Sequence, residues 1–221
     1  MQRAVIFDVD GVLVDSWDAH FRSWRDVLRE HGLDMSEDEF GRTFGRTSRE
    51  IIRSFWGDEV DDATARAIDD RKEALYRDLV REAFPVMDGA VALIDALRAA
   101  GFVLGVGSSA PPENVVLSLE GLERREAFGA IVTGRDVTRG KPDPQVFQLA
   151  AERLGVAPGQ CAVIEDAPAG VRAAAAAGMA NVALLGTAPR ETLLEAGACL
   201  TVESLRALTP EVIARLIDGD R

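Results

Sequence analysis

Hydrophobic positions along the chain follow two different periods. Short apolar runs, several of them rich in branched side chains, are typical of strands buried in a parallel sheet. They occur at 4–7, 102–107, 130–133, 161–165, 181–185 and 198–201. Apolar residues three or four positions apart predict helices between these runs, at 90–100, 112–119, 144–154 and 167–177. The alternation predicts a doubly wound, Rossmann-like α/β fold, a parallel sheet with helices on both faces.

The segment 16–84 shows helical periodicity alone. Its first helix is expected at 17–31, and the sequence Thr47-Ser48-Arg49-Glu50 predicts a capping box that opens a second. A third, charged helix is expected over 61–81, with an apolar stripe formed by Ala67, Ile68, Leu75, Tyr76 and Leu79. We therefore expect a core domain made of 1–15 and 85–221, interrupted by an all-helical domain at 16–84.

Composition narrows the classes of function. The net charge of −12 disfavours binding to nucleic acid or to an anionic membrane, because both need a basic surface. No signal peptide or membrane-spanning run is recognisable, and Cys161 and Cys199 lie in apolar surroundings that suit free thiols. We expect a cytoplasmic protein. Only Lys72 and Lys141 are lysines among 25 basic residues, so a compact positive charge is expected to matter where they occur.

Two acids and a glycine, Asp8, Asp10 and Gly11, follow the first apolar run. Residues two apart in a strand point to the same side, so the carboxylates of Asp8 and Asp10 are expected to project together and to need a cation or a shared proton. Gly11 permits a sharp turn or close approach to a ligand. Because ligands of open α/β sheets bind at the carboxyl ends of strands, the stretch indicates a site. The alternative is a solvated acidic turn.

Three later strand ends also carry polar side chains. Ser108 and Ser109 precede a proline-led helix start, where hydroxyls and backbone N–H groups can bind an oxyanion, or where serine simply caps a helix. Lys141, in a proline-stiffened loop, can neutralise a phosphate or carboxylates, or can be a surface lysine. Glu165 and Asp166 offer the hard oxygen ligands that Mg²⁺ accepts, or favourable charges at a helix start.

The stretch 105–110 also fits a loose dinucleotide fingerprint, but it has no matching ribose-binding acid about 20 residues on. Together the strand ends favour metal-assisted phosphoryl transfer.

The polar residues at these four strand ends resemble the four motifs of the haloacid dehalogenase superfamily of phosphohydrolases. The motifs occur in the same order and extend over the whole chain. The helical segment is similar to the cap of the β-phosphoglucomutase-like and phosphoglycolate-phosphatase-like branch. The stretches that carry this second likeness are 20–24 and Gly45-Arg46-Thr47-Ser48-Arg49-Glu50.

That resemblance implies a role for each matching residue. Asp8 would be the nucleophile that forms an aspartyl-phosphate, and Asp10 the general acid and base. Mg²⁺ would be bound by the Asp8 carboxylate, the Asp10 backbone carbonyl and Asp166, with Glu165 as a direct or near ligand. Ser108, Ser109, Gly11 and Lys141 would contact the phosphoryl group. In the helical cap, His20 and Arg49 would contact the substrate, and Lys72 is expected to meet phosphate or solvent.

The resemblance leaves phosphatase and mutase as alternatives. Mutases of this branch carry polar and basic residues after the strand serine for a second phosphate, whereas this chain has Ala110-Pro111-Pro112. We therefore expect a Mg²⁺-dependent phosphatase of small phosphorylated metabolites, sugar or polyol phosphates, with a β-phosphoglucomutase-type mutase as the alternative. The protein is expected to be a monomer, with no nucleic-acid or membrane partner.

Overall fold

The computed structural model describes residues 2–43 and 47–219. The chain divides into two compact units. The core unit comprises Met1–Asp15 and Val86–Arg221, and the helical unit comprises Ser16–Pro85. Gly45 and Arg46, which contribute to the likeness to the mutase branch, lie outside the described residues.

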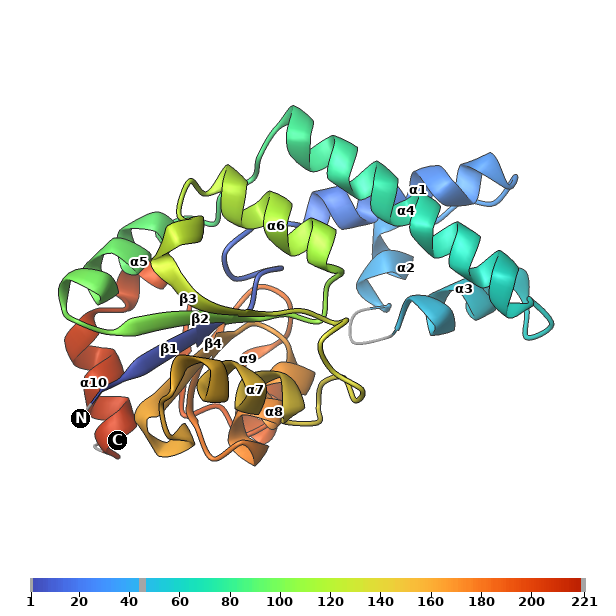
Figure 1. Cartoon of the computed structure of the whole chain (residues 1–221). Coiled ribbons are helices and arrows are strands. Elements are labelled where there is room, and N and C mark those ends of the chain that lie inside the picture. Colours follow the sequence, from blue (N-terminus) through green and yellow to red (C-terminus); the bar gives the residue numbers. More distant parts are fainter. Residues whose placement is uncertain (1, 44–46, 220–221) are drawn as a thin grey trace. The chain divides into compact units, whose positions relative to one another are not determined.

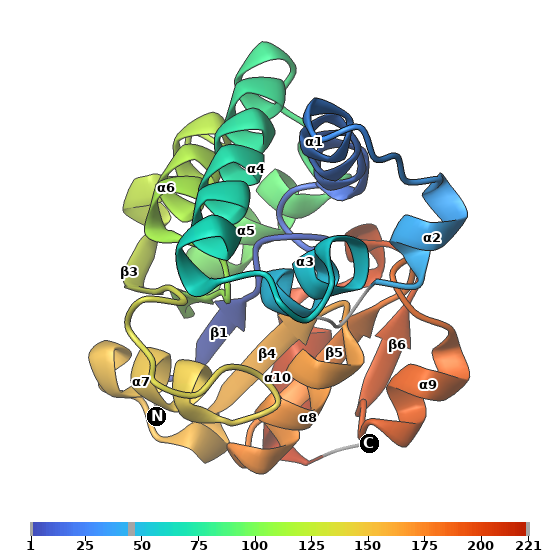
Figure 2. The same ribbon diagram turned by 90° about the vertical axis from the view of Figure 1, so that its right-hand side faces the viewer.

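A parallel sheet forms the centre of the core unit. Within the described residues it has six strands in the order β3-β2-β1-β4-β5-β6. Their bounds are β1 Ala4–Phe7, β2 Val103–Gly107, β3 Phe128–Val132, β4 Cys161–Glu165, β5 Ala180–Leu184 and β6 Leu200–Val202. Figure 2 shows β1, β4, β5 and β6 side by side in that order. From β1 the sheet grows towards β2 and β3 on one side and towards β4 on the other, and such a switch point is where ligands of doubly wound sheets bind.

Helices cover both faces of this sheet. The six described α-helices of the core unit are α5 Ala90–Ala99, α6 Pro112–Gly121, α7 Gln145–Leu154, α8 Pro168–Ala176, α9 Arg190–Glu195 and α10 Pro210–Asp218. Ala4 and Ile6 of β1 share a cluster with apolar residues of α7 and α8. Val5 and Phe7 point the other way and are equally buried, at 0 % exposure. A strand buried on both faces explains why β1 is apolar at every position.

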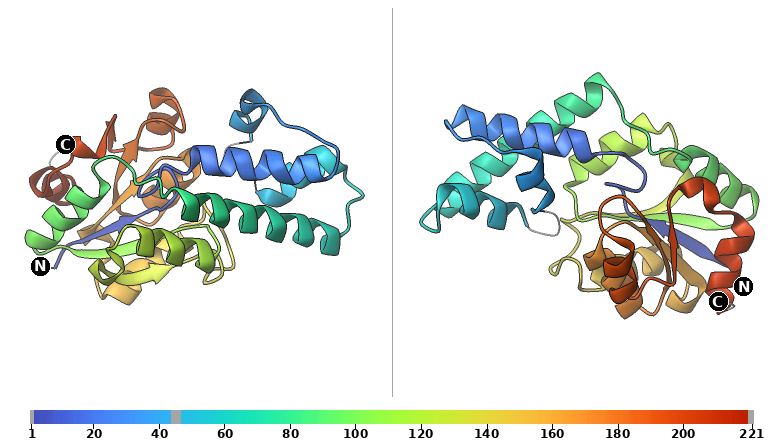
Figure 3. Two further views of the ribbon diagram at one scale, coloured as in Figure 1. Left: turned by 90° about the horizontal axis from the view of Figure 1, so that it is seen from above. Right: turned by 180° about the vertical axis from the view of Figure 1, so that it is seen from behind.

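The helical unit contains, within its described residues, α1 Trp17–Glu30, α2 Glu37–Gly41, α3 Ser48–Trp56 and α4 Asp62–Glu82. In Figure 3, α1 (blue) and α4 (green) lie side by side. Thr47 caps α3 in the predicted capping box with Glu50, which confirms that prediction. The core of the unit gathers Trp24, Leu28, Phe40, Ile52 and Ile68 from all four helices. No described helix has both the length and the apolar character needed to span a bilayer.

The predicted doubly wound α/β class is confirmed, while some details differ. The apolar stripe expected on α4 is wrong in part: Ala67 is exposed, and the buried face includes Ala65, Lys72 and Val80 beside Ile68 and Tyr76. The error arises because a buried lysine and glutamate interrupt the apolar pattern on which the prediction relied. Helices α2, α9 and α10 were not predicted, and β3 begins two residues earlier than expected.

Candidate active site

Three carboxylates meet where β1 and β4 end. Phe7 and Ile164 are paired in register, so Asp8 and Glu165 follow on adjacent strands, and the Asp8 N–H donates to the Ile164 carbonyl at 3.0 Å. Asp8, Glu165 and Asp166 are buried, and one oxygen from each lies within 4.8 Å of the others. Main-chain pairing of the two central strands thus forces like charges together.

Lys141 lies between two of these acids. Its Nζ is 2.9 Å from Asp8 Oδ1 and 2.6 Å from Glu165 Oε1, and it sits 4.9 Å from the centre of the Phe147 ring. The lysine belongs to the loop before α7, and the peptide bond joining it to Pro142 is cis. The side chain is 8 % exposed, so the predicted alternative of a surface lysine is wrong. Lys141 is a buried counter-charge.

Three carboxylates share one lysine in the cluster, and the pKa values of two of them are raised. Burial raises the pKa of Asp8 to about 7; Lys141 opposes this rise, and the charges of Glu165 and Asp10 add to it. Burial and the charges of Glu165 and Asp8 also raise the pKa of Asp166 well above its ordinary value. For Lys141 burial alone would lower the pKa, but Asp8 and Glu165 outweigh it and raise the pKa. A cation that relieved this repulsion would favour the ionised carboxylates.

Asp10 and Gly11 lie in a turn beyond β1. The strand ends at Phe7, so alternation along a strand does not orient Asp10 as expected; its backbone instead pairs with Val14. The Asp10 charge still raises the pKa of Asp8. Gly11 has a φ of +73°, and a Cβ at this position would lie 2.0 Å from Asp166 Oδ2. Gly11 therefore makes room for an acidic side chain of the cluster.

The serines after β2 differ from one another. Ser108 is 1 % exposed, and its Oγ accepts a hydrogen bond of 3.0 Å from the Ala110 N–H. Because the oxygen acts as acceptor there, the hydroxyl proton can be donated to an anion. Ser109 is exposed, and its carbonyl packs against the loop after β3, where a Cβ on Gly134 would be 2.4 Å away. Strand pairing of β1 and β2 places Ser108 at the sheet edge that carries Asp8.

Two further contacts of the acid cluster were not predicted from the sequence. The Thr187 hydroxyl, in the loop after β5, donates a hydrogen bond to Asp166 Oδ2. In α8, a Cβ on Gly170 would lie 1.7 Å from Glu165 Oε1, so this glycine makes room for Glu165. Thr187 could have been found as a hydroxyl residue after a further predicted strand. The close approach of Gly170 to Glu165 depends on the tertiary structure, so the sequence pattern does not indicate it.

The predicted site residues of the helical unit form contacts of their own. His20 stacks on Tyr76 with ring centres 4.2 Å apart, and its Nδ1 is 2.9 Å from Lys72 Nζ. Lys72 also donates to Glu73 Oε1 at 2.7 Å and is 3 % exposed. The predicted alternative in which Lys72 contacts solvent is therefore wrong. Arg49 forms an ion pair with Asp62, and its side chain is half exposed.

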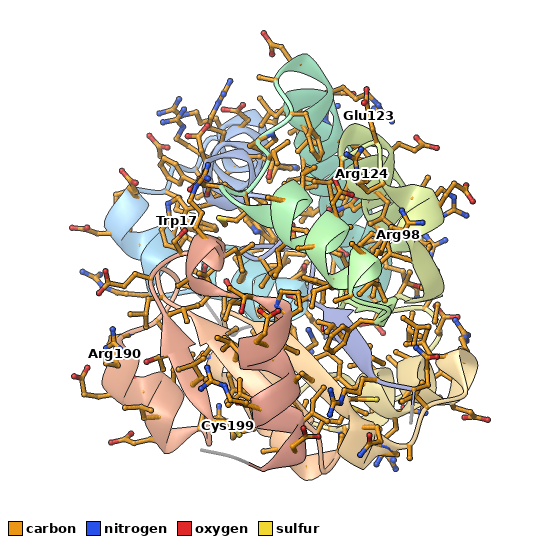
Figure 4. All side chains as sticks on the ribbon, turned by 90° about the vertical axis from the view of Figure 1, so that its left-hand side faces the viewer. Trp17, Arg98, Glu123, Arg124, Arg190 and Cys199 are labelled. Carbon is orange, nitrogen blue, oxygen red and sulfur yellow. The ribbon has the colours of Figure 1, made fainter. Side chains whose placement is uncertain are left out.

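The arginines and the two lysines occupy different environments. Arg124 and Arg190, labelled in Figure 4, are exposed or partly exposed; Arg124 pairs with Asp95 at 2.9 Å and Arg190 with Glu203 at 3.5 Å. Both lysines are buried among carboxylates and rings. The prediction that the rare lysines mark positions needing a compact charge fits this difference.

Figure 1 shows the central sheet with helices around it, the architecture of a doubly wound α/β protein. The buried cluster of acids and Lys141 lies where β1 and β4 end, at the switch point of this sheet. The family model described as haloacid dehalogenase-like hydrolase matches residues 2–178. The chain belongs to this family of hydrolases, which confirms the predicted superfamily and the prediction of an enzyme.

Relatives of the chain include phosphatases and a mutase. It is 34 % identical to validoxylamine A 7'-phosphate phosphatase of Streptomyces hygroscopicus subsp. limoneus, covering 90 % of this chain and 93 % of that protein. It is 33 % identical to β-phosphoglucomutase of Bacillus subtilis (strain 168), covering 96 % and 93 %. It is 34 % identical to hexitol phosphatase A of Escherichia coli (strain K12), covering 94 % and 93 %.

Among solved structures, a family IA, variant 3 HAD hydrolase from Entamoeba histolytica HM-1:IMSS is similar over the chain. The TM-score is 0.90 at 28 % identity, over 99 % of this chain and 100 % of that one. This likeness agrees with the predicted Rossmann-like core of the superfamily.

Proposed function

We propose that the protein is a Mg²⁺-dependent phosphatase that hydrolyses small sugar or polyol phosphates through an aspartyl-phosphate. The observation that carries this proposal is the position of Asp8, which is buried, paired with Lys141 at 2.9 Å and clustered with Glu165 and Asp166. The names of the phosphatase relatives support the class of substrate.

In the first half of the reaction an Asp8 carboxylate oxygen forms a bond to phosphorus while the bond from phosphorus to the alcohol oxygen breaks. Asp10 gives its proton to the departing alcohol. Asp10 then takes a proton from water, the water oxygen bonds to phosphorus, and inorganic phosphate leaves as Asp8 is released. Lys141 stabilises the negative charge on the phosphoryl oxygens, and Ser108 donates its hydroxyl proton to one of them.

The residues of the cluster fit a divalent cation. Their donor atoms are carboxylate oxygens, which suit Mg²⁺. Full ionisation of the three carboxylates beside one lysine would leave two negative charges, which a divalent cation balances. Asp8, Glu165, Asp166 and the Asp10 carbonyl would hold the ion. Bound Mg²⁺ neutralises charge on the phosphoryl group and the carboxylates.

The predicted phosphate contacts of Ser109 and Gly11 and the substrate contacts of Arg49 and His20 are part of the same proposal. So are the division into core and cap domains, the monomeric state and the cytoplasmic location.

The phosphatase is favoured over the mutase by the residues after Ser108. Ala110, Pro111 and Pro112 offer no charged side chain for a second phosphate, and the Ala110 N–H is bonded to Ser108. The mutase relative has an identity similar to those of the phosphatases, so identity alone does not separate the alternatives.

The test is a phosphate-release screen over hexitol phosphates, hexose phosphates and other phosphorylated metabolites, with Mg²⁺ and with EDTA. We expect Mg²⁺-dependent release from at least one sugar or polyol phosphate. In parallel, β-glucose 1-phosphate is incubated with the protein and a trace of the bisphosphate, and glucose 6-phosphate is measured. Rapid formation of glucose 6-phosphate without phosphate release would replace the phosphatase with the mutase. Release that persists in EDTA would refute the role of Mg²⁺.

A further inference from the structure

The loop after β5 brings a hydroxyl to the acid cluster. β5 ends at Leu184, and the next N–H, that of Leu185, donates to the Val202 carbonyl of β6 at 2.8 Å. Gly186 follows with a φ of +139°, a value that L side chains rarely adopt. The chain therefore leaves the sheet at a fixed point and turns at Gly186, which places Thr187 beside Asp166.

Asp166 Oδ2 is held from two directions. Thr187 Oγ1 donates a hydrogen bond to this oxygen. On another side the backbone of Gly11 lies so close that a Cβ there would be 2.0 Å from the same atom. The two contacts come from loops after different strands, β5 and β1, and both act on one oxygen of a carboxylate that is 5 % exposed.

We infer that Thr187 is a positioning residue, which fixes the rotation of the Asp166 carboxylate so that Asp166 is presented to a divalent cation. A carboxylate turns readily about its last bond, and outer hydrogen bonds restrict this rotation in metal sites. The Thr187 hydroxyl donates to Oδ2, so Oδ1 keeps its lone pairs for the ion. This inference rests on the proposed function, because it takes Asp166 as a metal ligand.

Direct titration of Mg²⁺ into the metal-free protein by isothermal calorimetry tests the inference without any catalytic turnover. Thr187→Val removes the hydroxyl and keeps the shape of the side chain, whereas Thr187→Ser keeps the hydroxyl. Thr192→Val, on the neighbouring helix α9, is the matched control. We expect Thr187→Val to bind Mg²⁺ about 10-fold more weakly than the wild type, and Thr187→Ser and Thr192→Val to stay within about threefold of it.

The melting temperature of each metal-free variant separates positioning from folding. We expect Thr187→Val to melt within about 3 °C of the wild type, a change of less than about 1 kcal/mol in a chain of this size. Wild-type Mg²⁺ affinity in Thr187→Val, or an equal loss in Thr187→Ser, overturns the inference while the proposed function stands. If neither the wild type nor any variant binds Mg²⁺, the metal site and the inference both fail.

Discussion

Lys141 in the core unit and Lys72 in the helical unit are the two lysines of the chain, and each is buried beside a carboxylate and an aromatic ring. Their surroundings differ in charge. Lys72 contacts one carboxylate, that of Glu73, and the ring of His20, so its direct ion pair is balanced in charge. The charge of Asp69, which is partly buried, also acts on this pair. Lys141 contacts Asp8 and Glu165, with Asp166 adjacent, so that cluster has a negative excess when its three carboxylates are ionised.

The difference shows how a buried charge that stabilises a fold is told from one that serves a reaction. A buried ion pair whose charges balance needs no further ion. The loss of one of its partners is expected to destabilise the fold. Burying several like charges raises the free energy of the folded state. This cost is relieved when a cation, or an anionic group together with a cation, binds to the cluster. By this reasoning we expect the core cluster to be the reactive one and the Lys72 cluster to hold α1 to α4.

Lys141→Met gives the largest expected effect. The substitution keeps the length of the side chain and removes the charge between Asp8 and Glu165. We expect kcat/KM for phosphate release to fall by roughly 10³-fold, as when a group that stabilises transition-state charge is lost. Arg124→Met, which removes a partly exposed arginine, is the matched control and should retain wild-type activity. Activity of Lys141→Met within about tenfold of the wild type would contradict the role of Lys141.

Lys72→Met tests the balanced cluster by its stability. Glu73 would lose its ion pair with Lys72 while remaining buried, so we expect the free energy of unfolding to fall by about 3 kcal/mol in urea titrations. The double variant Lys72→Met/Glu73→Gln should recover part of this loss, and Mg²⁺ should have no effect on the difference. Restoration of stability by Mg²⁺ would show that the two clusters do not differ as described.

The pH dependence of stability reports on Asp8. Its pKa is raised from 3.8 to about 7, so between these values the folded protein binds more protons than the unfolded chain. The Asp8 contribution to stability is therefore present at low pH and is lost as the pH rises to about 7. In EDTA we expect the wild type to lose of order 2 kcal/mol more than Asp8→Asn between pH 4 and pH 7, as measured by urea unfolding. Parallel curves for the two proteins would contradict the raised pKa.

Gly170→Ala gives the smallest expected effect. Alanine is favoured over glycine in a helix by about 1 kcal/mol, so α8 alone would gain stability. The added Cβ would, however, lie 1.7 Å from Glu165 Oε1. We expect no gain in melting temperature and a roughly tenfold fall in kcat/KM, as for other changes behind a metal ligand. The control is Gly41→Ala in α2, where the nearest atom is 3.7 Å from the added Cβ. A more stable and fully active Gly170→Ala would refute the close contact.

The parts of this account that the sequence predicted are those that depend on local pattern. β1 and β4 are apolar because both faces are covered, and the acids that follow them could be assigned to one sheet edge from topology alone. Asp10 was expected to follow the strand, but β1 ends earlier and a turn holds it. The burial of Lys72 and the contacts of Thr187 and Gly170 depend on side chains distant in sequence, which periodicity does not report.

Phosphate release by Asp8→Asn measures the central claim most directly. Asparagine keeps the size of the side chain but is a poor nucleophile and offers one oxygen where the carboxylate offers two. With Mg²⁺ and the best substrate of the screen, we predict that release falls by roughly 10³-fold or more while the variant stays folded. Release by the folded Asp8→Asn protein at the wild-type rate would contradict the assignment of Asp8 as the nucleophile.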